Sequence, residues 1–154
     1  MPGTQYTGKA GHLAVMGEFC LRGYNAAMPE IDKGDDVFVV NDLTGAMWRL
    51  QVKTSLGTQQ TTSRRYQFRI RNTAINVAQT PELHFAFVLR KEHVWHFLLM
   101  DRPVLRTYVR NNNLGTAAGE YRQLTFVFHQ DGRLMCSGID LANHLEDWAT
   151  WPRL

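Results

Sequence analysis

The sequence predicts an α/β fold in which a mixed central β-sheet is flanked by helices. Three observations lead to this prediction: apolar residues recur at helical spacing near both ends, the middle of the chain alternates strictly, and the length is 154 residues. That length is typical of one domain. Hydrophobic residues make up 44% and charged residues 20%, which excludes disordered and fibrous classes. We therefore expect a single domain over residues 1–154.

The first helix is expected at residues 10–22, after a lead-in of which residues 1–8 should be flexible. Gly23 is placed to end the helix as a C-terminal cap, and Gly17 would allow close packing. The apolar stripe of this helix would consist of Leu13, Val15, Met16, Phe19 and Cys20.

Three strands should follow the helix. Tyr24–Met28 is a short candidate, and Asp36–Val40 and Ala46–Thr54 should form a hairpin around the turn signals at residues 41–45. The second hairpin strand alternates, with Trp48, Leu50 and Val52 on one face and Arg49, Gln51 and Lys53 on the other.

The central part of the chain predicts three further strands. After a polar loop at Ser55–Ser63, Arg64–Arg71 alternates between apolar and basic residues. Leu83–Leu89 and Val94–Met100 are apolar runs around a turn at residues 91–93, as expected of a buried hairpin.

The last third is expected to return to the sheet and then to a helix. Val104–Val109 fits a short helix or a strand, Asn111–Gly119 a loop, and Leu124–His129 a strand that ends at a turn. Asp140–Trp148 predicts a final helix with Asp140 as its N-cap.

Composition narrows the cellular setting. No apolar run approaches the ~20 residues that cross a bilayer, and the N-terminus lacks the pattern of a secretion signal, so we expect a cytoplasmic protein without a membrane role. Cys20 and Cys136 are too few for a disulfide framework or a four-cysteine zinc site. We expect both to be reduced core residues.

Charge is unevenly distributed although the net value is only +3. Residues 1–62 carry 5 basic and 6 acidic residues, residues 63–110 carry 9 and 3, and residues 111–154 carry 3 and 5. The middle segment, at +6, is therefore a basic region between two acidic ones, which favours an anionic partner.

The chemistry-bearing residues lie in the predicted hairpin. Gln51 and Lys53 share a face, and the hairpin can bring that face beside Asp36. The result would be a carboxylate, an amide oxygen and an ammonium around one point. Mg²⁺ prefers oxygen ligands and keeps several waters, and a bound metal can activate water and neutralise a phosphate. Phosphodiester hydrolysis is a sensible use of such a group.

Asp36, fourteen intervening residues and then Gln51-Val52-Lys53 resembles the PD-(D/E)XK nuclease superfamily. The layout is similar to the branch in which Gln replaces the Glu, which includes group I intron homing endonucleases and relatives of archaeal Holliday junction resolvases. The resemblance covers about residues 9–55, including the helix and Arg22-Gly23-Tyr24.

This resemblance implies a restriction-endonuclease-like fold and a metal-dependent site. Asp36 and Gln51 would bind Mg²⁺, with Mn²⁺ as a substitute, the backbone carbonyl of Val52 would complete the shell, and Lys53 would be the catalytic lysine. The first-helix Glu of many relatives is not matched. The residues that would support the site in its place are His12, Glu18 and Asp32.

The basic strand is the second functional signal. Same-face side chains repeat about every 6.6 Å along a strand, which is comparable to the spacing of phosphates on a nucleic-acid strand. We expect the arginines here to bind nucleic acid, and the alternative is a solvated edge strand that its charge protects from aggregation. These arginines are Arg64, Arg65, Arg69 and Arg71.

The leading hypothesis is a Mg²⁺-dependent endonuclease that acts on DNA, as a homodimer where both strands are cut. A second hypothesis is a catalytically inactive protein of the same fold that binds nucleic acid or a protein partner. A structural protein without a nucleic-acid role is the third.

Overall fold

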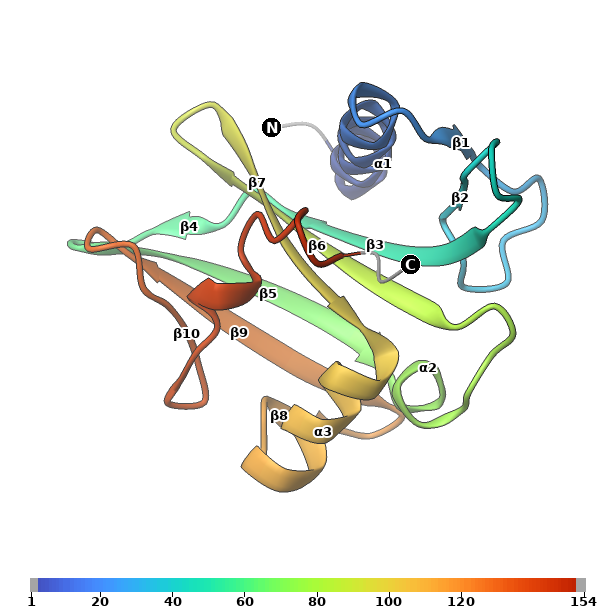
Figure 1. The fold of residues 1–154 in the computed structure, drawn as a ribbon. Helices are drawn as coiled ribbons and strands as arrows, with labels where there is room; N and C mark the ends of the chain where they lie inside the picture. The colour runs from blue at the N-terminus through green and yellow to red at the C-terminus, as the bar shows by residue number, and fades with distance from the viewer. Residues whose placement is uncertain (1–2, 152–154) are drawn as a thin grey trace.

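Two β-sheets pack face to face in the computed structural model, which describes residues 3–151 (Figure 1). The first sheet has the order β1-β2-β3-β6-β7. Its β3–β6 pair is parallel and its other pairs are antiparallel, so the sheet is mixed, as expected. Its strands are β1 (Asn25–Ala27), β2 (Val37–Val40), β3 (Met47–Ser55), β6 (Leu83–Lys91) and β7 (Val94–Asp101).

The second sheet is entirely antiparallel and was not expected as a separate layer. It has the order β11-β10-β9-β5-β4. β10 pairs with the end of β9, and β8 pairs with its beginning. Its strands are β4 (Thr58–Gln59), β5 (Ser63–Arg71), β8 (Thr116–Ala118), β9 (Tyr121–His129), β10 (Leu134–Cys136) and β11 (Ile139–Asp140). The α/β class is confirmed, with a sheet taking the place that helices were expected to fill.

Helices complete the layers. α1 (Thr4–Leu21) covers the outer face of the first sheet, and α2 (Asn72–Asn76) and α3 (Arg102–Asn112) lie at the other end of the molecule (Figure 1). Val104–Val109 is therefore helical, with the Asp101 carboxylate accepting a hydrogen bond from the backbone N–H of Val104 at 2.8 Å. No helix among the described residues is both long and apolar enough to span a membrane.

The core has two layers because β6 and β7 bury side chains on both faces of the first sheet. Aromatic and aliphatic side chains of the two sheets meet between them, as in the 5.2 Å contact between the rings of Phe68 and Phe87. A second cluster, which includes Val15, Phe19 and Leu50, fills the space between α1 and the first sheet. The predicted alternation in β3 and β5 is confirmed by this burial.

The first helix starts earlier and packs on a different stripe than expected. It begins at Thr4, so residues 4–8 are helical rather than a flexible lead-in, and residues 1–2 lie outside the described part of the chain. Leu13 and Cys20 are exposed, because α1 packs through a narrower stripe at four-residue spacing. That stripe consists of Gly11, Val15 and Phe19.

The end of α1 follows the prediction. Gly23 has φ of +84°, its N–H donates to the carbonyl of Cys20, and the Tyr24 N–H donates to that of Phe19. These two hydrogen bonds are those of a Schellman cap, which favours glycine at this position. The chain therefore turns directly from α1 into β1.

The prediction of a final helix over Asp140–Trp148 is wrong. Only a 3-10 turn at Ala142–His144 forms, and Glu146 has φ of +56°, which ends helical geometry. Glu146 instead completes the edge of β7, because its N–H donates to the Phe97 carbonyl at 2.7 Å and its carboxylate accepts from the Phe97 N–H at 2.9 Å. Leu141 and Leu145 pack in the core between the sheets, whereas Trp148 packs against the cluster under α1.

Cys136, on β10, is buried as expected, whereas Cys20 is exposed on α1. α2, β4, β8, β10 and β11 had no counterpart in the prediction. Each has five residues or fewer, too few for periodicity to identify.

Candidate active site

One cavity of about 610 Å³ joins the three motif residues with part of the basic strand. It opens between the loop before β2, the β3 strand and the end of β5. Its lining consists of Asp32, Lys33, Gly34, Asp36, Gln51, Lys53, Arg69, Arg71, Thr73 and Tyr121. The site residues are thus brought together by hairpin pairing and by the packing of the two sheets.

Asp36 is held at the start of β2 by its backbone and its side chain. Its N–H donates to the Leu50 carbonyl at 2.8 Å, and its Oδ2 accepts from the Val52 N–H at 2.7 Å. Burial raises the pKa of this carboxyl, and the hydrogen bond from Val52 opposes that rise. Oδ1 has His12 Nε2 at 3.9 Å, too far for a hydrogen bond. One carboxylate oxygen is therefore fixed by the backbone, and the other is available to a ligand.

Gln51 carries an unpaired acceptor at the same cavity. The residue is 7% exposed, and its Nε2 donates to the Gly34 carbonyl at 3.0 Å. Its Oε1 is buried and has no hydrogen-bond partner among the described residues. Buried polar atoms are nearly always paired, so this oxygen is suited to an external partner such as a cation or a water.

Lys53 supplies positive charge beside these two oxygens. It follows Gln51 by two residues on β3, so it projects from the same face of the strand. Burial dominates the raised pKa of Asp36, and the charge of Lys53 is among the influences that lower it. The predicted trio of carboxylate, amide oxygen and ammonium is therefore assembled at one place.

The three residues expected to support the site lie in different surroundings. His12, on α1, faces Asp36, and burial lowers its pKa, so the imidazole is neutral at neutral pH. Asp32 lines the cavity, and its Oδ1 accepts from the Gly34 N–H at 2.8 Å. Glu18 does not line the cavity, and its carboxylate pairs with Arg22 one helical turn later.

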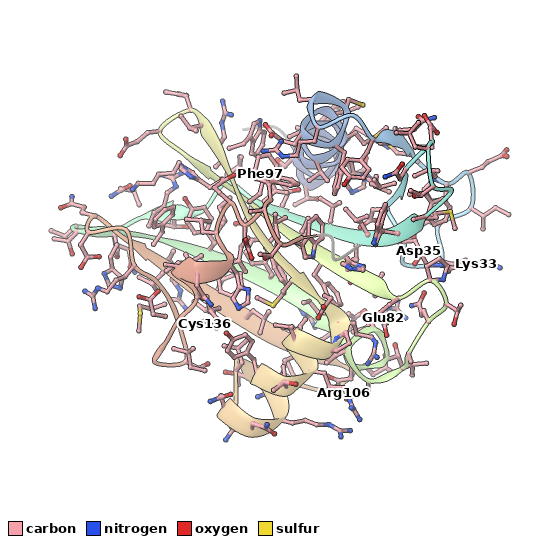
Figure 2. The ribbon with its side chains drawn as sticks, viewed as in Figure 1. Lys33, Asp35, Glu82, Phe97, Arg106 and Cys136 are labelled. Atoms are coloured by element: carbon pink, nitrogen blue, oxygen red, sulfur yellow. The ribbon has the colours of Figure 1, made fainter. Side chains whose placement is uncertain are left out.

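Asp35, the residue before the motif aspartate, is buried although its place next to a strand in a polar segment suggests a solvated residue. It is 5% exposed, and its Oδ2 lies 3.0 Å from Nη1 of Arg49 on β3. Figure 2 shows Asp35 near Lys33, at the margin of the molecule where the loop before β2 turns. The ion pair ties this loop to β3 and so helps to place Asp36.

The arginines of β5 separate into three groups. Arg69 and Arg71 are exposed and line the cavity, and Arg65 lines a different pocket. Arg64 faces the other way, and its guanidinium donates to the carbonyls of Leu56 and Gly57. Arg64 therefore holds the loop after β3, whereas the other three arginines are exposed.

Tyr121 and Thr73 are lining residues that sequence reasoning missed. The Tyr121 ring lies 4.5 Å from the Arg69 guanidinium and 5.7 Å from that of Arg71, a cation–π arrangement that holds both arginines at the cavity. The predicted strand began at Leu124, three residues later. Only the register that pairs Arg71 with Tyr121 reveals the contact.

The donors present fit a hard cation that retains most of its waters. No group of three or more His, Cys, Asp or Glu side chains within the described residues is placed to hold a metal. Mg²⁺, however, is often bound through one or two carboxylates together with waters and substrate phosphates. Asp36 Oδ1 and the unpaired Oε1 of Gln51 are oxygen ligands of this kind.

Comparison with known proteins identifies a similar fold. No family model and no curated protein matches the chain. Among solved structures, a bacterial homing endonuclease matches with a TM-score of 0.53 and 18% sequence identity, over 70% of this chain and 74% of that chain. This similarity shows a nuclease-like α/β fold, and the chemistry is argued from the site below.

Proposed function

We propose that the protein is a metal-dependent nuclease that hydrolyses phosphodiester bonds in DNA. The observation that carries this proposal is the single cavity in which Asp36, Gln51 and Lys53 meet Arg69 and Arg71. The nuclease-like fold supports it, and so does the resemblance of the motif to the Gln-containing branch of the PD-(D/E)XK superfamily.

Each residue has a distinct role in this proposal. Asp36 Oδ1, Gln51 Oε1 and the backbone carbonyl of Val52 would hold Mg²⁺, or Mn²⁺ in its place. When bound, the ion supplies a water of lowered pKa and neutralises charge on the phosphate. Lys53 orients the attacking water and stabilises the charge that develops on the phosphoryl oxygens.

The groups around this centre position the substrate and the ligands. Arg69 and Arg71 bind phosphates beside the scissile bond, since their guanidinium groups are exposed at the cavity. The neutral His12 orders water against Asp36 Oδ1. Asp32 adds negative charge at the rim, which strengthens the attraction for a cation.

The second candidate function is nucleic-acid binding without catalysis. The neutral Gln51 and the single carboxylate ligand favour it, because both lower the affinity for a cation. The two functions share the Arg69–Arg71 surface and differ in whether strand cleavage depends on a divalent metal.

The deciding experiment incubates supercoiled, linear, single-stranded and branched DNA with Mg²⁺ or Mn²⁺. We expect the wild type to cut at least one substrate, and Asp36→Ala and Lys53→Ala to lose about 10²-fold or more in rate. Binding by each variant is followed by fluorescence anisotropy. If a folded wild type binds DNA without cutting it, the second candidate is correct, and if the variants cut like the wild type, the assigned site is wrong.

Cleavage of both strands of a duplex would require two copies of this single site. We propose a homodimer in that case, acting in the cytoplasm. Light scattering of the free protein and of its DNA complex would test the assembly, and a monomer in both would restrict the enzyme to cutting one strand at a time.

A further inference from the structure

A second polar pocket, of about 430 Å³, lies at the other end of β5. No role at this pocket follows from the motif, since none of its lining residues belongs to the Asp36–Lys53 site. Its lining consists of Ser55, Gly57, Thr58, Gln60, Arg65 and Gln67.

The two pockets adjoin between β3 and β5, and we call the pair the β3–β5 cleft. On β3, Lys53 lines the first pocket and Ser55, two residues on, lines the second. On β5, Arg69 lines the first and Gln67 lines the second. Residues two apart project from the same face about 6.7 Å apart, so the pockets adjoin on both walls.

The end wall of the cleft is held rigidly by the loop after β3. The Arg64 guanidinium donates to the Leu56 and Gly57 carbonyls, and the Ser63 hydroxyl donates to Gln60 Oε1 at 3.0 Å. Gly57 has φ of +66°, and a Cβ there would lie 2.7 Å from the Tyr66 ring. The pocket is therefore shaped by fixed backbone rather than by a loose loop.

The groups that face this pocket are polar, and its lining contains no acidic residue. Arg65 and Gln67 are exposed, and neither side chain makes an ion pair or hydrogen bond with another described residue. Thr58 lies directly across the β4–β5 ladder from Arg65. A guanidinium, an amide and a hydroxyl are thus available together, a set that suits a phosphate with an attached hydrogen-bonding group.

We propose that the second pocket binds one nucleotide of the DNA strand whose scissile phosphate lies at Asp36, with Arg65 on the phosphate and Gln67 on the base. This inference rests on the proposed nuclease function. It makes Gln67 a determinant of substrate binding and gives the enzyme a minimum substrate length, since a strand must span both pockets of the β3–β5 cleft to bind fully.

The test measures binding of fluorescein-labelled oligodeoxynucleotides, from three to ten nucleotides long, by anisotropy in Ca²⁺. The wild type should show a step in affinity at the length that fills the second pocket. Gln67→Ala should remove that step, a loss of about 5- to 10-fold on long oligonucleotides, as expected for one hydrogen-bonded base contact. Gln67→Ala should leave the binding of oligonucleotides shorter than the step unchanged.

The salt dependence of oligonucleotide binding separates the phosphate contact of Arg65 from the base contact of Gln67. Arg65→Gln should lower the slope of log K against log salt by about 0.7, the value for one phosphate on a single strand, whereas Gln67→Ala should leave the slope unchanged. Arg110→Gln and Asn112→Ala are matched controls, because both residues are exposed on α3 and line neither pocket of the cleft.

The inference is overturned if the wild type shows no affinity step, or if Arg65→Gln and Gln67→Ala bind every length as the controls do. Cleavage assays in Mg²⁺ distinguish this failure from failure of the proposed function. A length step without any cleavage supports the nucleotide subsite and refutes the nuclease function. Cleavage that neither Arg65→Gln nor Gln67→Ala affects supports the nuclease function and refutes the subsite.

Discussion

At the residue scale, the site is defined by how individual oxygen atoms are paired. Asp36 Oδ2 is satisfied by the Val52 N–H, whereas Gln51 Oε1 is buried without a partner among the described residues. The fold therefore tolerates a half-buried carboxylate of raised pKa and an unpaired amide oxygen at one cavity. Both features cost stability in the absence of a ligand, and such costs are concentrated at functional sites.

Asp36→Asn should abolish cleavage and raise the free energy of unfolding of the metal-free protein at pH 7. The asparagine oxygen can still accept from the Val52 N–H, and the neutral amide avoids the burial cost that raises the pKa of Asp36. Urea denaturation in EDTA measures the difference, and Mg²⁺ should stabilise the wild type but not the variant.

The pH dependence of this difference has a definite sign. Because the folded pKa of Asp36 is raised above that of the unfolded chain, ionised Asp36 destabilises the wild type at pH above its folded pKa. The advantage of the variant should shrink as the pH falls through that folded pKa and disappear below about 3.9, the unfolded value. A variant less stable than the wild type at pH 7 would contradict this account.

At the scale of elements, α1 is placed by a close approach to β3. A Cβ at Gly11 would lie 1.8 Å from Oγ1 and 2.8 Å from Cβ of Thr54, so only glycine fits. A Cβ at Gly17, where the sequence predicts close packing, would have no neighbour within 4 Å. Because α1 also carries His12, its depth on the sheet sets the distance from His12 to Asp36.

Gly11→Ala and Gly17→Ala should therefore have opposite effects on stability. Gly11→Ala should lower the free energy of unfolding by about 1–3 kcal/mol, because the helix must move away from β3. Gly17→Ala should raise it by up to ~1 kcal/mol through helix propensity alone. Chemical denaturation of both variants provides the comparison, and equal effects would show that α1 is not held at this distance.

At the scale of the whole molecule, packing of the two sheets brings opposite charges to one cavity. The acidic loop before β2 belongs to the first sheet and the arginines belong to β5 of the second, yet both line the same space. Two arginines of the basic segment, Arg69 and Arg71, thus lie beside the proposed cation site, where a polyanion would pass. The net charge of +3 alone conveys none of this arrangement.

Replacing Arg69 and Arg71 together by Gln should weaken duplex DNA binding. It should lower the slope of log K against log salt by about 1.8, because each lost phosphate contact removes roughly 0.9. The folded state should be little affected, because both side chains are exposed. Anisotropy titrations across a range of KCl concentrations measure the slope, with Arg110→Gln on α3 as the control. An unchanged slope would remove these arginines from the nucleic-acid surface.

The sequence by itself determined the α/β class, the β2–β3 hairpin, the alternation of β5 and the approach of Gln51 and Lys53 to Asp36. These depend on residues close in the chain, where periodicity and turn chemistry are decisive. Only the tertiary structure decided that β5 belongs to a second sheet, that Arg64 holds a loop, and that Tyr121 contacts Arg69 and Arg71. It also decided that Glu146 pairs with β7, in a segment where the sequence predicts a helix. The physical reason is that strand partners and burial are chosen by packing between distant segments, which local patterns do not encode.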